Sequence, residues 1–109
     1  MLAEFIATGS PTRLSRAIEE FARAQGHVSA LVVPWESDAG TVSIAVTSVK
    51  ADGWAIEHTN LGTIRLIDLG NDSTRVAIAP DEQRCAEAPQ LGDVFDRFAR
   101  QVQRRFAAS

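Results

Sequence analysis

The sequence contains a single cysteine, Cys85, so no disulfide can form within the chain, and no cysteines and histidines stand at the spacing of a zinc site. A long apolar run is also lacking. The longest, about five residues at 30–34, is far short of the roughly 20 that a membrane-spanning helix requires. The N-terminus has no basic segment ahead of an apolar stretch, as a secretory signal would have. These absences predict a cytoplasmic protein that does not enter a membrane.

An excess of basic residues is missing as well. The net charge is -3, which creates no broad field for nucleic acid or an anionic membrane, so we expect neither as a partner. Glycine-rich phosphate loops, GxGxxG fingerprints, HExxH pairs and GxSxG elbows are all absent from the sequence. We therefore expect no cofactor and no metal, and we favour a non-enzymatic role.

What the chain does contain is typical of one globular domain spanning residues 1–109. Hydrophobic residues make up 45% and charged residues 23% of the sequence. A chain of this length can bury roughly two-thirds of its unfolded surface, which is enough for a core without disulfides.

Two segments have the pattern of helices. Ser10 and Pro11 form a favourable N-terminus, apolar residues follow at helical spacing, and Gly26 provides the stop. In residues 91–107, apolar side chains recur at helical spacing, with aspartates near the start and arginines near the end, as the helix dipole favours. We expect this second helix to cover a sheet.

Short β-branched segments, which alternate or are bounded by turn residues, predict strands. The expected strands are residues 2–8, 28–34, 41–49, 54–59, 62–69 and 74–79. Turns are expected at 36–40, 51–53, 60–61 and 70–73, and an exposed loop at 80–90. The fold class is therefore α+β: an antiparallel sheet of about six strands in the order β-α-β-β-β-β-β-α, packed against a long C-terminal amphipathic helix.

The expected turns also predict which side chains share a face of the sheet, because directly opposed residues point to the same side. A three-residue loop at 51–53, a two-residue turn at 60–61 and a four-residue loop at 70–73 give one mainly apolar face. Its predicted members are Val42, Ile44, Val46, Trp54, Ile56, His58, Thr63, Arg65, Ile67, Leu69, Val76 and Ile78. Ile64 and Leu66 fall on the opposite face, where they would favour association through an uncovered sheet face.

Three polar residues, His58, Thr63 and Arg65, intrude on the predicted apolar face. A histidine beside an arginine in an apolar concavity can bind a carboxylate or another small anionic group. His58 could then act as a general base, with Arg65 holding an anionic substrate. Trp54 and Phe98 would line the same apolar groove, between the sheet and the C-terminal helix.

A simpler interpretation of these polar residues stays open. The histidine and the threonine would lie, hydrated, at the open end of a hairpin. The arginine would then form an ion pair with an acid such as Asp93, Asp96 or Glu4, as a buried charge requires. Either tryptophan, Trp35 or Trp54, would ordinarily be a core residue in so small a domain.

Other polar residues give weaker indications. Asp68 and Arg75 should form a cross-strand ion pair of little energetic value. Cys85 has no neighbouring base in the sequence, so we do not expect it to be a nucleophile. The arginine stripe Arg97, Arg100 and Arg104 alternates with aspartates, which indicates a solvated helix face.

The order strand, helix, antiparallel strands, long C-terminal helix resembles the helix-grip superfamily of START-like proteins, which includes polyketide cyclase-like ligand binders. The segment 62–70, the strand at 73–76 and the helix from Leu91 carry the resemblance. Members generally run longer and have more strands, and they share no catalytic residue that could be carried over. The resemblance implies a ligand site between sheet and helix.

The sequence thus predicts a small ligand- or partner-binding module with an apolar groove between the sheet and the C-terminal helix. Its partner would be a small apolar or carboxylate-bearing ligand, or a second copy of the chain. The alternatives are a small cyclase, hydrolase or isomerase using His58 and Arg65, and an oligomerising accessory domain.

Overall fold

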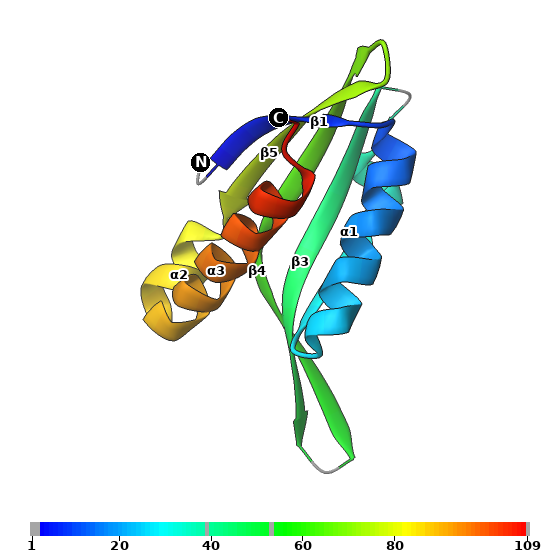
Figure 1. Ribbon diagram of the computed structural model, residues 1–109. Coiled ribbons are helices and arrows are strands. Elements are labelled where there is room, and N and C mark those ends of the chain that lie inside the picture. The colour runs from blue at the N-terminus through cyan, green and yellow to red at the C-terminus, as the bar shows by residue number, and fades with distance from the viewer. Residues whose placement is uncertain (1–2, 39, 53, 109) are drawn as a thin grey trace.

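The computed structural model describes residues 3–38, 40–52 and 54–108, and of residues 51 and 52 only the backbone. The elements in order are β1 (Ala3–Thr8), α1 (Pro11–Gln25), β2 (Val28–Val32), the 3-10 turn η1 (Pro34–Glu36), β3 (Thr41–Asp52), β4 (Ala55–Gly70), β5 (Ser73–Pro80), α2 (Glu82–Glu87) and α3 (Pro89–Phe106). All strand pairs are antiparallel, in the order β1-β5-β4-β3-β2. Helices α1 and α3 cover one face of the sheet (Figure 1). The α+β class and the C-terminal helix are confirmed, but the sheet has five strands rather than about six.

The first helix has the ends that the sequence predicts. The Ser10 side chain accepts a hydrogen bond from the Arg13 backbone N–H at 3.3 Å, and Pro11 occupies the first turn. At the other end, Gly26 adopts the left-handed conformation with φ of 82°, which glycine reaches without strain. Between these caps, Leu14 and Ile18 are buried against the sheet.

The main error of the sequence prediction lies in β4. Residues 54–59 and 62–69 are not two strands joined by a turn at 60–61; residues 55–70 form one strand of 16 residues. Val46 pairs with Gly62 and Thr47 with Asn60, so Leu61 is an extra residue in the ladder, a β-bulge. Leu61 is fully buried. An apolar residue in the core therefore occupies the place where a turn was expected.

The predicted face of β4 is consequently inverted. Ile64 and Leu66 are fully buried in the core, whereas Arg65 is exposed and lies with Ile67 on the other face of the sheet. The inversion follows from the missing turn, because a turn at 60–61 would place Arg65 opposite Ile56, whereas the continuous strand places Ile64 opposite Ile44.

A second register error, at the next turn, cancels the first. The four-residue loop expected at 70–73 is a two-residue turn, because Gly70 pairs with Ser73. Asn71 and Asp72 have φ of 53° and 59°, the left-handed pair that suits a tight hairpin. This turn alone would keep the expected register, but the pairing shifts between Asp68 and Gly70, so Leu69 is a second extra residue in the ladder. Val76 consequently faces Leu66 rather than Ile67, and it lies in the core as predicted.

The core lies between the sheet and the two long helices. From α3 come Phe95, Phe98 and Val102, and from the central strands come Ile44 and Ile64, all buried. Each large apolar side chain removed from water in this way contributes roughly 1.5–3 kcal/mol. The predicted covering of the sheet by the C-terminal helix is confirmed.

The end of the chain differs from the prediction in one respect. Residues 80–90, expected as an exposed loop, include the short helix α2, whose first turn is capped by the Asp81 side chain. After α3, Ala107 forms a bridge with Ala7, and the Ala108 N–H donates to the Ile6 carbonyl at 2.7 Å. Among the described residues, no helix is both long enough and apolar enough to cross a membrane.

One part of the sheet has no helix over it. Strands β3 and β4 continue as a two-stranded hairpin well beyond the body (Figure 1), which lengthens the molecule to 46 × 24 × 24 Å. Their pairing continues through Val49 and His58 as far as Asp52 and Ala55. We call residues 49–58 the hairpin arm; its residue 53 lies outside the described part of the chain.

The close contact between β4 and α3 gives a first prediction. A Cβ at Gly62 would overlap the Ala79 carbonyl oxygen and lie 2.5 Å from Cζ of Phe95. We expect Gly62→Ala to lower the free energy of unfolding by roughly 1–3 kcal/mol, the usual cost of overpacking. Gly40→Ala is the control, because a Cβ there meets nothing within 4 Å. Urea denaturation of both variants tests this, and equal stability of the two would contradict the described packing.

Candidate binding surfaces

The structure does not bring the predicted polar site together. His58 and Arg65 both belong to β4, seven positions apart, or roughly 20 Å along an extended strand. His58 is exposed on the hairpin arm, with Nδ1 3.3 Å from Oγ1 of Thr47. Arg65 is exposed on the sheet face opposite the helices, with half-buried Thr63 two positions away on that same face.

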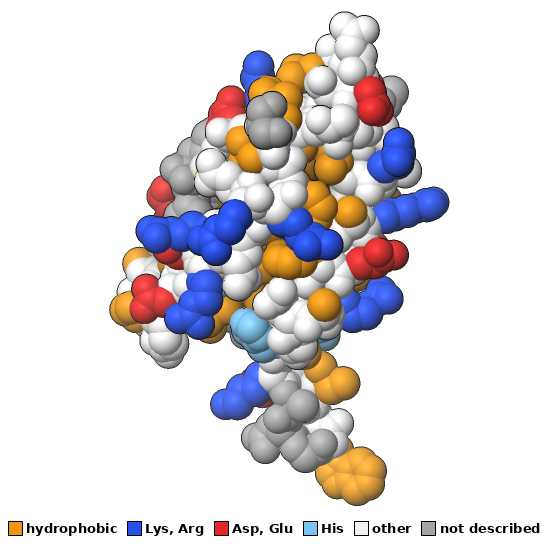
Figure 2. All heavy atoms as spheres, in the orientation of Figure 1, with side chains coloured by type: hydrophobic (Ala, Val, Ile, Leu, Met, Phe, Trp, Pro, Cys, Tyr) orange, Lys and Arg blue, Asp and Glu red, His pale blue; other side chains and the backbone are white. Residues whose placement is uncertain are grey.

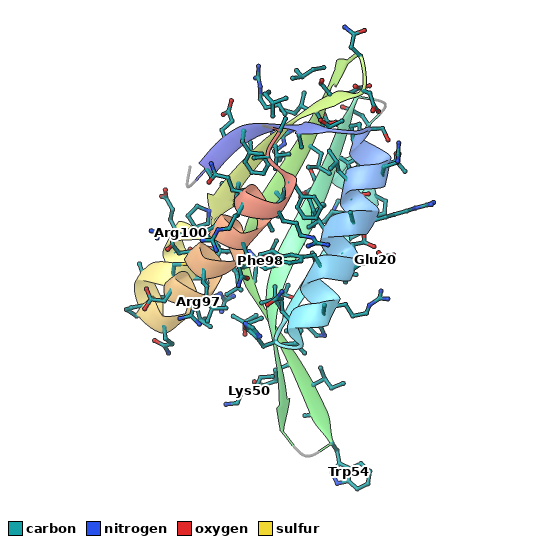
Figure 3. The ribbon with its side chains drawn as sticks, in the orientation of Figure 1. Glu20, Lys50, Trp54, Arg97, Phe98 and Arg100 are labelled. Atoms are coloured by element: carbon teal, nitrogen blue, oxygen red, sulfur yellow. The ribbon has the colours of Figure 1, made fainter. Side chains whose placement is uncertain are left out.

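The two predicted aromatic site residues are also far apart. Phe98 is buried beneath α3 and stacks on Phe21, with 5.9 Å between the ring centroids. Trp54 lies fully exposed at the tip of the hairpin arm (Figure 3). Trp35, the other tryptophan, is 84% exposed on η1, so the expectation that the tryptophans are core residues is wrong.

Comparisons of the chain with models of protein families, with curated proteins and with solved structures find no match. The search for a functional site therefore depends on the chemistry of the chain's own surface. Three surfaces and one polar corner of the molecule are the candidates.

The hairpin arm is the most unusual of these surfaces. Beside the fully exposed Trp54, Ile56 is 67% exposed, and Lys50 and Glu57 are exposed with them. A two-stranded hairpin without a covering layer is marginally stable in water by itself. This arm is held because its strands continue into the sheet at β3 and β4. The sequence predicted a hairpin loop at 51–53, but Ala51 and Asp52 pair with β4, which corrects the predicted register. Strand alternation also could not show that the hairpin leaves the body.

A second surface is the groove between α1 and α3, which we call the interhelical groove. Phe21 packs on Phe98 and, edge to face, on Phe106, with 6.1 Å between the centroids of the latter pair. The Arg105 guanidinium carbon lies 5.6 Å from the centre of the Phe21 ring, within cation–π range. Above this cluster is an open hollow of about 410 Å³. Its lining residues are Ala17, Glu20, Phe21, Ala24, Gln25, Arg105 and Phe106.

The third surface is the sheet face away from the helices. Its described side chains are mostly small, with exposed Ile6 and Leu31 among them. Arg75 pairs here with Glu4, at 3.5 Å between Nε and Oε1. The expected pair of Arg75 with Asp68 is therefore wrong, since an Asp68 carboxylate oxygen accepts the Gly70 N–H instead.

The polar corner lies between β4 and α2. Asp81 accepts hydrogen bonds from the Arg84 backbone N–H at 3.0 Å and from the Asn60 side-chain amide at 2.8 Å. These two bonds hold the pKa of Asp81 below its ordinary value. Nearby, burial and the Asp81 charge raise the pKa of the Cys85 thiol, which opposes thiolate formation. This corner caps a helix, and within the described chain no group of three metal-binding side chains occurs.

The capping bonds give a second prediction. Replacing Asn60 by alanine should raise the pKa of Asp81 towards its ordinary value, because the amide donor is lost. Since folding lowers the pKa of Asp81, its contribution to stability is present above pH 4 and is lost as the pH falls through the folded-state pKa. The stability difference between wild type and Asn60→Ala should therefore shrink in acid.

Carboxyl-carbon NMR titration of Asp81 in both proteins measures this directly. A Gln83→Ala variant is the control, because it leaves both capping bonds in place. An unchanged Asp81 titration in Asn60→Ala would show that the amide bond has no influence on the carboxylate.

Proposed function

We propose that this domain is a non-enzymatic binding module that contacts a partner protein through its hairpin arm. The observation that supports the proposal is the complete exposure of Trp54 at the end of a paired hairpin, with Ile56 exposed beside it. A tryptophan at the tip of a projecting element is a suitable anchor, because aromatic residues dominate the energetics of protein interfaces.

The free energy gained by burying Trp54 in an interface is sufficient for a specific contact. A tryptophan buries 150–250 Å² on association, which corresponds to roughly 4–6 kcal/mol of gross hydrophobic free energy. Part of this offsets the loss of rotational and translational freedom. The paired strands reduce a further cost, because an arm that is already ordered loses little conformational entropy on binding.

The partner could be a second copy of this chain, as expected for an oligomerising accessory domain. A small apolar or carboxylate-bearing ligand, the other predicted partner, would bind in the interhelical groove, whose 410 Å³ hollow is within the size range of ligand pockets. We favour a protein partner because that hollow is open and the sheet-facing side of α3 is packed. The alternative of a hydrolase or isomerase requires His58 and Arg65 to contact the same substrate. We do not favour it, because the two residues are seven positions apart on β4.

The resemblance to START-like helix-grip proteins stays a prediction, as does the cytoplasmic location. The order of strands and helices and the C-terminal helix over the sheet support the resemblance. A large ligand cavity, which the family would imply, is not part of our proposal.

A photo-crosslinking amino acid at position 54 tests the proposal in the cells from which the chain derives. The same amino acid at position 35, the exposed tryptophan of η1, is the matched control. We expect a discrete crosslinked protein, or a crosslinked dimer, at position 54 and none of the same kind at position 35.

Competition with purified protein makes this result specific. An excess of wild-type protein should remove the crosslink, and an excess of Trp54→Ser should not. Because Trp54 touches no core residue, Trp54→Ser should keep its unfolding free energy within about 0.5 kcal/mol of wild type. Equal competition by both proteins, or equal crosslinking at positions 35 and 54, would refute a role for the arm.

A further inference from the structure

The charges of this acidic chain are unevenly distributed. Helices α1 and α3 carry seven arginines against four acidic residues, whereas the rest of the chain carries four basic and ten acidic residues. Arginines gather over the two helices on the face shown in Figure 2. The face formed by these two helices, which contains the interhelical groove, therefore carries a net positive charge even with Glu20 in the lining of the groove, and we call it the positive face.

Several of these arginines are available to a ligand. The described chain has two ion pairs between charged side chains, and one of them joins Arg100 to Asp96 at 3.0 Å. Arg97 and Arg104 form no such pair among the described residues, and both are exposed. Figure 3 shows Arg97 and Arg100 on the solvent side of α3.

The positive face also has an apolar centre. Phe21 and Phe106 are half-buried in the interhelical groove, next to the 410 Å³ hollow. A second open hollow of about 360 Å³ shares Phe21, Gln25 and Arg105 with the first, and it extends to Gln101 and Arg104. From Ala17 to Gln25 the wall formed by α1 runs about 12 Å, two turns of a helix.

From these two features we infer that the interhelical groove docks an acidic segment of a partner protein that carries large apolar side chains along one face. The apolar side chains would enter the hollows beside Phe21 and Phe106, and the acidic ones would meet Arg97 and Arg104. This is the helix-in-groove form of recognition, in which residues one turn apart supply the anchors. Charge complementarity favours a partner of negative charge and accelerates its association.

Nucleic acid and anionic membranes match the positive face less well than an acidic segment of a protein does. Nucleic acid and anionic membranes extend beyond the groove, towards parts of the chain that carry ten acidic residues against four basic ones. A short acidic segment can contact the positive face without extending to the acidic parts of the surface. The inference is independent of the hairpin arm, which lies outside both hollows.

The test is binding of a fluorescent 16-residue peptide with leucine at helical i, i+3 and i+4 spacing and glutamate at the remaining positions. A peptide with lysine in place of glutamate is its control. We expect the glutamate peptide to bind at least tenfold more tightly than the lysine peptide. Its affinity should fall at least threefold when the salt concentration rises from 50 to 300 mM, since exposed charges are screened.

Charge reversal then locates the site. The double variant Arg97→Glu/Arg104→Glu should weaken binding of the glutamate peptide at least tenfold. Arg65→Glu, a change at an exposed arginine on the opposite face of the sheet, should leave it unchanged. Circular dichroism confirms that the variants are folded, and Trp54→Ser should bind the peptide like wild type.

Three results would overturn the inference: equal binding of the two peptides, an equal loss for Arg65→Glu, or tighter binding to another anion than to the peptide. The other anions are vesicles of equal parts phosphatidylserine and phosphatidylcholine, and a 16-base-pair DNA duplex. Loss of peptide binding in Trp54→Ser would also contradict it, because it would move the site to the arm.

Discussion

The contact between Gly62 and the ring of Phe95 is the point on which the rest of this fold depends. Phe95 is fully buried, and only a residue without a Cβ leaves room for it above β4. Directly before this glycine stands the buried bulge residue Leu61, which changes the register of β3 against β4. On one side of the bulge, Ile64 and Leu66 lie in the core beneath the helices; on the other, the same two strands leave the body as the arm. A single extra residue thus separates the packed part of β4 from its projecting part.

The local structure of this chain could be predicted largely from its sequence. The ends of α1 follow from Ser10, Pro11 and Gly26, and the amphipathic pattern of α3 places Phe98 and Val102 in the core. These features depend on neighbours within one or two turns. The same holds for the inner face of β3, where strict alternation identifies Ile44 and Val46.

Register could not be obtained in the same way. Asn60, Leu61 and Gly62 have the composition of a turn, yet the burial of Leu61 and the tight packing of Phe95 on Gly62 keep the strand continuous. The burial of Leu61 and the contact of Phe95 with Gly62 depend on residues more than thirty positions along the chain or in the helical layer. The local sequence does not show such tertiary contacts. The candidate site failed for that reason: His58 and Arg65 were brought together by a turn that does not exist. The exposure of Trp54 was missed because tryptophan ordinarily lies in the core.

The two surfaces with the strongest physical claims have different chemistry. The arm offers apolar side chains on an ordered, projecting hairpin, and the positive face offers arginines around an aromatic groove. They lie on different parts of the molecule, so two contacts can be made at once, by one extended partner or by two separate ones. Two simultaneous contacts on one rigid body raise the effective concentration for the second contact once the first is made.

The hydrogen bond from Ala108 to Ile6 has a consequence for how such molecules can stack side by side. It occupies the outer edge of β1 near Ile6 and Ala7, so among the described residues before this point the run of β1 left to a foreign strand is Ala3 to Phe5, shorter than an average strand. At the other edge of the sheet, the backbone N–H of Val32 in β2 donates a hydrogen bond to the Glu19 carboxylate at 3.2 Å. Copies joined edge to edge through β2 would present β1 edges that their own C-terminal segments partly cover, and this covering disfavours growth of the ladder into a fibre.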